Sequence, residues 1–122
     1  MTQEDKDLLL KDLCARLPYG VKADIVRSNN LHRIDWTIEE DDIHELKCGL
    51  IVDIKPYLRP MWSMTMEDEK EYCRLVQDTD NGIEPITNLM DWLNAYHFDY
   101  RGLIEKGLAL EAPEGMYSEK VK

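Results

Sequence analysis

The chain has 122 residues, of which 43% are hydrophobic and 33% are charged, and its formal net charge is -10. A chain of this length fits one domain and can bury about two-thirds of the surface that it exposes when unfolded. The acidic excess repels phosphate backbones and anionic bilayers. We therefore expect neither ordinary nucleic-acid binding nor membrane association.

The cysteines and the start of the chain indicate in which cellular compartment the protein resides. Cys14, Cys48 and Cys73 are odd in number and widely spaced, which predicts free thiols in a reducing environment. Each falls in an apolar pattern, so we expect small buried hydrophobic side chains. The polar start MTQEDKD does not resemble a signal peptide, and the apolar runs are too short to span a bilayer. We expect a soluble, cytoplasmic protein.

The first predicted element is a helix. Thr2 can cap it, and Leu9, Leu13 and Leu17 repeat every four residues along one face. Pro18 ends it, because the residue before a proline avoids the helical conformation.

Residues 21–38 predict a β-hairpin whose turn is Asn29–Asn30, because asparagine tolerates positive φ. A turn there places the apolar residues of both strands on one face, as a buried sheet requires. The expected pairs are Ile25 with Ile34, Ala23 with Trp36, and Val21 with Ile38. The same register sets Asp24 against Asp35 on the outer face, which is an unfavourable pair of like charges.

A third strand is predicted over residues 46–54, after an acidic turn at residues 39–42. Alternating apolar side chains define it. They are Leu46, Cys48, Leu50, Val52 and Ile54. Pairing this strand with the second one sets Leu46 opposite Trp36 and completes a three-stranded antiparallel meander with one apolar face.

Helices are expected again after residue 64. Thr65 is a good cap for a helix with a thin apolar face, and Asn81–Gly82 separates it from a second helix that Pro85 begins. Asp99 is expected to cap a short third helix that ends at Gly107. The prediction is an α+β fold: an N-terminal helix, the meander, then two or three helices packed on one face of the sheet. Residues 1–112 form the domain, and residues 113–122 form an extended or disordered tail.

No catalytic, cofactor or metal site is predicted. In the expected register His32 and His44 lie about 20 Å apart along the sheet, so they cannot share a metal. His97 is expected at a helix end, where a positive charge interacts well with the helix dipole. Residues 77–88 do not place calcium ligands at the required positions, and the acidic residues 39–42 read as a solvated loop.

The segment IKPYLRPMWSM, residues 54–64, has an unusual composition. It lies within the longest acid-free stretch of the chain, residues 54–66. Two interpretations stay open. In the first, the segment is a connector that covers the end of the core, and the Trp62 side chain fills that end. In the second, the segment is a surface that contacts a partner, because prolines hold it extended and it is rich in the aromatic residues, methionine and arginine that are common in interfaces. The hypothetical partner-binding residues are Tyr57, Arg59, Met61 and Trp62.

Three stretches, KDLCARLPYGVK, IKPYLRPMWSMT and WLNAYHFDYRGLIEKGLALEAPEGMY, cover a little under half of the chain. They resemble a family of short uncharacterised proteins from gut Bacteroides and their phages and mobile elements. Trp62 departs from that family, in which a small polar residue is expected. The family has no activity to carry over, so the resemblance implies a gene context and no mechanism.

The sequence leaves three interpretations of function. The leading one is a non-enzymatic accessory protein of a mobile element or phage that acts through contact with a protein partner or as a homo-oligomer. The second is a small enzyme with an unrecognised site built from carboxylates and histidines. The third is an acidic mimic of nucleic acid, which the interspersed lysines and arginines disfavour.

Overall fold

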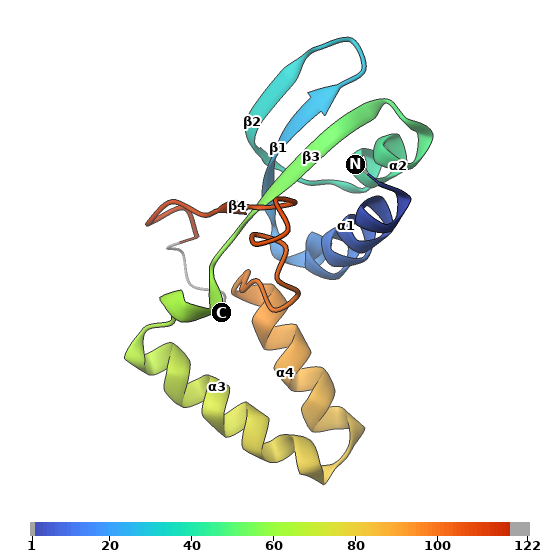
Figure 1. Cartoon of the computed structure of the whole chain (residues 1–122). Helices are drawn as coiled ribbons and strands as arrows, with labels where there is room; N and C mark the ends of the chain where they lie inside the picture. Colours follow the sequence, from blue (N-terminus) through green and yellow to red (C-terminus); the bar gives the residue numbers. More distant parts are fainter. Residues whose placement is uncertain (1, 118–122) are drawn as a thin grey trace.

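A mixed sheet of four strands organises residues 2–117, which are the residues that the computed structural model describes. The strand order is β2-β1-β3-β4, and the fold is α+β (Figure 1). The helices and strands are α1 (Gln3–Arg16), β1 (Lys22–Arg27), β2 (His32–Thr37), α2 (Glu40–Cys48), β3 (Ile51–Leu58), α3 (Met66–Asp78), α4 (Ile83–Ala95) and β4 (Leu110–Glu111). Three short 3-10 turns join them at Leu17–Tyr19, Met61–Ser63 and Thr79–Asn81.

The N-terminal helix α1 confirms the prediction from its cap and its leucines. The Thr2 side chain accepts a hydrogen bond from the Asp5 backbone N–H at 3.1 Å, which satisfies one of the free donors of the first turn. Leu9 and Leu13 are fully buried. The helix gives way to a 3-10 turn that contains Pro18, as expected from the proline.

The hairpin of β1 and β2 is confirmed, but half of its register is wrong. Ala23 faces Trp36 as predicted, whereas Ile25 faces Arg33 across an irregularity and not Ile34. Ile34 is 72% exposed. Asp35 takes a left-handed φ of 56°, and its backbone N–H donates to the Asp24 carboxylate at 3.3 Å. The bulge thus relieves the opposition of two aspartates that the regular register would impose.

The strand predicted over residues 46–54 is wrong in its first half, because residues 40–48 form helix α2, and correct from Ile51, where β3 begins. The acidic residues read as a turn lie in the first turn of α2, where they complement the helix dipole. Gly49, at φ 88°, ends the helix. Ile43 and Leu46 are buried three residues apart on one helical face. The alternation of apolar residues therefore belongs partly to a helix and only from Ile51 to a strand.

The meander is also wrong, because β3 pairs with β1 and not with β2. Ile25 lies opposite Ile54 and Ala23 opposite Pro56 in an antiparallel ladder, so β1 is an inner strand of the sheet. The helix between β2 and β3 supplies the length needed to pass over the hairpin to its other side. The short strand β4 pairs in parallel with β3 at Tyr57 and Leu58.

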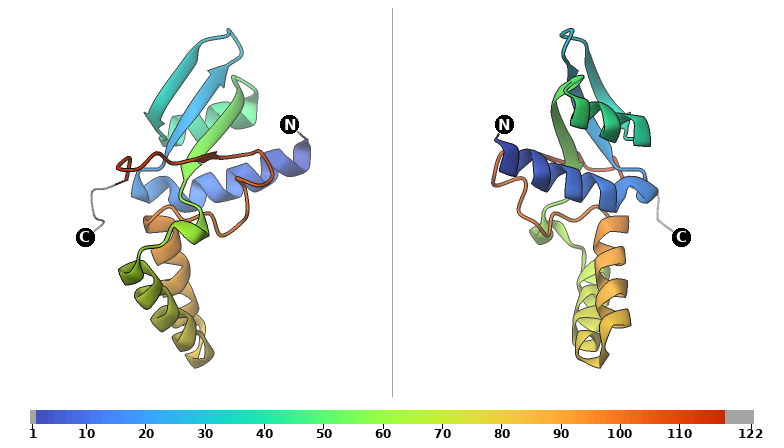
Figure 2. Two further views of the ribbon diagram at one scale, coloured as in Figure 1. Left: turned by 60° about the vertical axis from the view of Figure 1, so that its left-hand side comes forward. Right: turned by 90° about the vertical axis from the view of Figure 1, so that its right-hand side faces the viewer.

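The two N-terminal helices, α1 and α2, bury their apolar faces against one face of the sheet (Figure 2). The principal core residues are Leu9, Leu13, Val21, Ala23, Ile25, Ile43, Leu46, Ile51, Ile54, Leu58 and Leu103. The C-terminal helices α3 and α4 do not pack on the sheet, contrary to the prediction. They form an antiparallel hairpin that projects from the end of the molecule (Figure 1).

Aromatic side chains hold the helical hairpin together. The Trp92 ring lies 6.4 Å from Tyr72 of α3, 5.2 Å from Tyr96 and 5.5 Å from Phe98, measured between ring centroids. The thin apolar face of α3 therefore packs against α4, as the contact between Tyr72 and Trp92 shows. Arg59 and Phe98 form a parallel bridge where the chain enters and leaves the hairpin.

A buried ion pair ties α1 to the base of the helical hairpin. The Asp12 and Arg16 side chains are fully buried, and Arg16 Nε lies 2.9 Å from Asp12 Oδ2. Arg101 Nε lies 3.0 Å from the other oxygen of Asp12. Arg16 Nη2 donates to the Phe98 carbonyl at 2.6 Å. One carboxylate thus balances two guanidinium groups in the interior.

The short helix predicted after Asp99 is replaced by turns. The Asp99 carboxylate still acts as a cap, because it accepts from the backbone N–H groups of Leu103 and Ile104 at 2.8 and 3.0 Å. Gly102 adopts φ 73°, a left-handed conformation that interrupts a helix. After β4, the Met116 N–H donates to the Pro113 carbonyl at 3.1 Å. The tail predicted over residues 113–122 thus contains a turn, and residues 118–122 lie outside the described residues.

Candidate functional site

A groove of about 450 Å³ lies between two segments of the chain that are distant in sequence, residues 59–65 and residues 111–117. The first segment belongs to the stretch predicted to contact a partner. The second follows β4 and crosses the end of the sheet (Figure 2). The lining residues are Arg59, Pro60, Trp62, Ser63, Thr65, Glu111, Ala112, Pro113, Glu114, Gly115 and Tyr117.

Of the four predicted partner-binding residues, Arg59 and Trp62 line this groove. The Trp62 side chain is 77% exposed, so it does not plug the end of the core. Met61 is half-buried in a 3-10 turn and does not line the groove. Tyr57 lies in β3, and its hydroxyl donates to Asp24 Oδ1 at 2.7 Å. Partial burial, and next the bond to Asp24, raise the pKa of the Tyr57 hydroxyl to about 12.

Arg59 is held in place by contacts within the chain. Its guanidinium lies 3.0 Å from Asp68 Oδ2 and 4.2 Å from the centroid of the Phe98 ring. Burial opposes ionisation of Asp68, but hydrogen bonds from Thr65 and Arg59 outweigh burial and lower the pKa of this carboxyl. The backbone of Arg59 accepts from Asp99 and donates to the His97 carbonyl. Arg59 therefore forms a fixed wall of the groove whose charge is already paired.

The prolines of this segment are buried and set its path. The strand predicted to end at Ile54 continues as β3 through Pro56 to Leu58. β4 pairs only from Tyr57 onward, so Pro56 lies where β1 is the one strand partner of β3. A proline, which has no N–H to donate, is tolerated at such a position. Pro60 then turns the chain outward and presents Trp62.

The opposite wall depends on Tyr117, which belongs to the stretch predicted to be a tail. Its hydroxyl accepts from the Lys22 N–H at 2.8 Å and donates to the Tyr57 carbonyl at 2.9 Å. A side-chain oxygen thus bridges β1 and β3 where the ladder ends beside Pro56. Burial raises the pKa of the Tyr117 hydroxyl. The one sequence signal for this wall is a single aromatic residue at the end of a turn sequence, EAPEGMY.

His97 supports this wall from inside the molecule. Its ring lies 3.9 Å from the Tyr117 ring, measured between centroids, and only 3% of the residue is exposed. Burial and the nearby charges of Arg16 and Arg59 lower the pKa of His97 to about 4. His97 lies at a helix end as expected, because it directly follows the C-cap of α4 and adopts φ 62°. The lowered pKa opposes the positive charge that was expected there.

The other reactive side chains lie apart from the groove. All three cysteines are exposed, which corrects the expectation that they are buried, because α1, α2 and α3 turn them away from the core. His44 is an exposed residue of α2 and not of a strand, and His32 is exposed in β2. Among residues 2–117, no group of three or more histidine, cysteine, aspartate or glutamate residues is placed to hold a metal ion. In the same range, no helix is long and apolar enough to cross a membrane.

Comparisons with known proteins assign no family, because no family model, no curated protein and no solved structure matches this chain. The chemistry of the groove is therefore the remaining guide to function. It combines an exposed indole, a fixed tyrosine, two prolines and carboxylates in a shallow concave surface.

Proposed function

We propose that the protein is a non-enzymatic interaction protein that contacts another polypeptide through the surface around Trp62. The observation that carries this proposal is the 77% exposure of Trp62 at the rim of the groove. Tryptophan is among the residues most often found as interface anchors. The pairing of Arg59 with Asp68 and Phe98 supports the proposal further, because a pre-organised wall loses little entropy when a partner binds.

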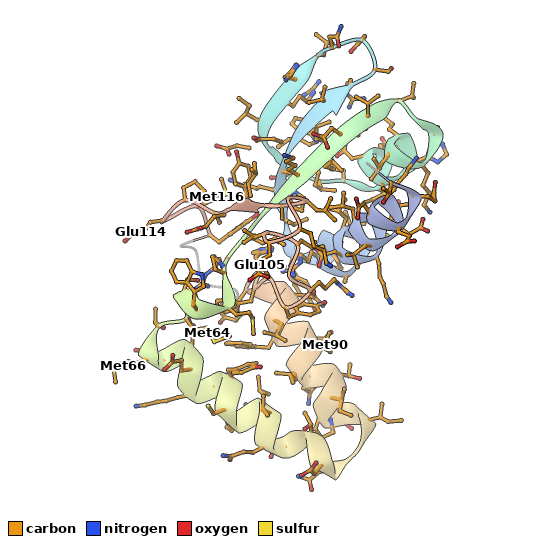
Figure 3. The ribbon with its side chains drawn as sticks, in the orientation of Figure 1. Met64, Met66, Met90, Glu105, Glu114 and Met116 are labelled. Carbon is orange, nitrogen blue, oxygen red and sulfur yellow. The ribbon has the colours of Figure 1, made fainter. Side chains whose placement is uncertain are left out.

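The surroundings of Trp62 extend the apolar surface. Met66, in the first turn of α3, is also 77% exposed. In Figure 3 it projects outward on the same side of the view as Glu114. Met66 does not line the groove, but two large exposed apolar side chains only four residues apart in the chain favour contact with a protein over a small polar ligand. The resemblance to proteins of Bacteroides phages and mobile elements supports an accessory role in such an element.

The enzyme and nucleic-acid mimic interpretations have no comparable support. None of the described residues that line the groove is a histidine or a cysteine, and His97 lies behind Tyr117 and is almost fully buried. For the mimic, basic side chains interrupt the acidic surface, as in the exposed contacts of Arg74 with Glu71 and Asp78. Interaction through Trp62 remains the function that the geometry favours.

A photo-crosslinking experiment tests the proposal in cells. A photoreactive phenylalanine analogue replaces Trp62 in the full chain, which is expressed in a Bacteroides host. Ile34 is the matched control, since it is an apolar residue 72% exposed on β2. We expect a discrete protein adduct from position 62 and none of that mass from position 34. Failure to form an adduct at position 62, or the same adduct at both positions, would contradict the proposal.

A further inference from the structure

Two carboxylates that line the groove have no cationic partner within residues 2–117. Arg59 is the one basic residue among the described residues of the lining, and its guanidinium is paired with Asp68 at 3.0 Å. Glu111 and Glu114 are both exposed, and neither side-chain carboxylate has a hydrogen bond or ion pair within the part of the chain that the structure describes. Figure 3 shows Glu114 at the outermost end of the C-terminal segment. The formal charge of -10 on the whole chain has the same sign. The groove therefore attracts a cationic occupant.

The aromatic and proline residues of the lining favour an extended occupant. Trp62 and Tyr117 present aromatic side chains, and Pro60 and Pro113 stand beside them. Grooves lined by aromatic side chains bind polyproline-type segments, whose preformed extended shape reduces the entropy lost on binding. A volume of about 450 Å³ is of the size that holds a small ligand or a few peptide side chains.

The aromatic wall is fixed before any partner arrives. The Tyr117 hydroxyl is bonded to the backbone of both Lys22 and Tyr57, and its ring is stacked on His97. Trp62 is the free component, because most of its indole faces solvent. An arginine or lysine side chain can lie on the face of an indole, where the cation is attracted to the ring, while carboxylates nearby bind its charge.

We propose that the groove binds a short extended segment of a partner protein that contains proline and at least one arginine or lysine. The basic side chain is held by Trp62 with Glu111 and Glu114, and the prolines pack on the aromatic lining. This inference rests on the proposed function, because it names the chemistry of the chain that contacts Trp62.

Peptide titration followed by NMR tests the chemistry of the groove. The probe is a synthetic peptide of about ten residues that alternates proline with arginine and leucine, and the control peptide has glutamate in place of arginine. Both are titrated into the ¹⁵N-labelled full chain. The three indole N–H signals of the chain are assigned by single substitutions to phenylalanine. We expect saturable shifts of the Trp62 signal with the basic peptide only, and weaker binding as salt is added.

Matched variants locate the charge. The double variant Glu111→Gln/Glu114→Gln is expected to weaken binding about tenfold or more, as for loss of charge-assisted contacts. Glu105→Gln removes an exposed glutamate that does not line the groove, so it should leave the affinity unchanged. Equal binding of both peptides, equal weakening by Glu105→Gln, or shifts confined to Trp36 and Trp92 would overturn the inference.

The two experiments fail separately. An adduct at position 62 in cells without peptide binding in the titration overturns the peptide class and leaves protein contact standing. Peptide binding without a cellular adduct supports the groove chemistry but contradicts the proposed function. If the adduct has twice the mass of the chain and sedimentation shows a dimer that Trp62→Ser dissociates, the occupant is a second copy, and the inference of a basic extended segment is wrong.

Discussion

Replacing Asp12 with asparagine should be the most destabilising single change of nearly constant shape in this protein. Asp12 is fully buried and lies 2.9 Å from Arg16 Nε and 3.0 Å from Arg101 Nε. Asparagine has the same shape but no charge, and its amide nitrogen cannot accept a hydrogen bond. Arg16 remains fully buried, with Nη1 lacking a partner already in the native chain. The substitution therefore leaves a buried guanidinium without its counter-charge.

The expected magnitude follows from that geometry. Removing one partner of a buried ion pair costs about 3–5 kcal/mol, because the remaining charge is still desolvated. The asparagine carbonyl can keep one of the two contacts, so we expect the lower part of this range. A total stability of about 5–15 kcal/mol is usual for a domain. For a chain of this length the melting temperature should fall by on the order of 10 °C.

Urea unfolding followed by far-ultraviolet circular dichroism measures the loss of stability. Glu71→Gln is the matched control, since it removes the carboxylate of an exposed pair with Arg74 on α3. Exposed pairs contribute little, so its unfolding midpoint should stay close to that of the wild type. A loss of less than about 1 kcal/mol for Asp12→Asn would refute the reasoning, because the buried pair would then behave like a surface pair.

Four further outcomes are expected. Trp62→Ser should leave the melting temperature nearly unchanged, because the indole is 77% exposed; a fall of about 10 °C or more, as for a core cavity, would show that Trp62 supports the core. Tyr117→Phe should cost about 1–3 kcal/mol by removing the bridge between Lys22 and Tyr57, whereas Tyr72→Phe, whose hydroxyl has no hydrogen bond within residues 2–117, should cost much less in the same urea assay. The pKa of His97 is lowered to about 4 from 6.5, so between these pH values the unfolded chain binds more protons than the folded chain. The free energy of unfolding should therefore fall as the pH falls from about 6.5 to 4. His97→Gln should flatten this dependence of stability on pH, and an unchanged dependence would contradict the assignment. Native mass spectrometry should give the same mass with and without chelator, and reproducible binding of one zinc ion would contradict the prediction that no specific metal site exists.

Local sequence chemistry predicted two helix starts correctly and the order of the strands wrongly. Thr2 and Thr65 cap helices as expected, because a cap depends on atoms within a few residues. The strand order could not be predicted in this way. Residues 46–54 alternate between apolar and polar side chains as a strand would. Residues 40–48 nevertheless fold as a helix, in which Ile43 and Leu46 lie on one buried face. A short apolar pattern fits both the period of a strand and the period of a helix, and only packing against β1 and β3 selects one of the two.

One of the two walls of the candidate groove could be predicted from the sequence. The unusual composition of residues 54–64 pointed to Arg59 and Trp62, which do line the groove. The other wall comes from residues 111–117, more than forty residues later in the chain. Nothing in a turn sequence indicates that Tyr117 will reach the backbone of Lys22, because that contact depends on where β3 ends. The pairing of Arg59 with Asp68 and Phe98 is likewise tertiary.

The parallel bridge between Arg59 and Phe98 has a consequence for how the chain can vary. The Arg59 N–H donates to the His97 carbonyl at 2.7 Å, and the Asp99 N–H donates to the Arg59 carbonyl at 2.9 Å. The polypeptide therefore departs from the sheet and returns to it at one place, as it would around an inserted module. Lengthening or shortening this helical hairpin at its far turn should therefore move neither end, provided that Asp68 and Trp92, which contact Arg59 and Phe98, are kept. We expect natural differences in chain length to collect there, and a foreign helical arm to be grafted at this point with the sheet intact.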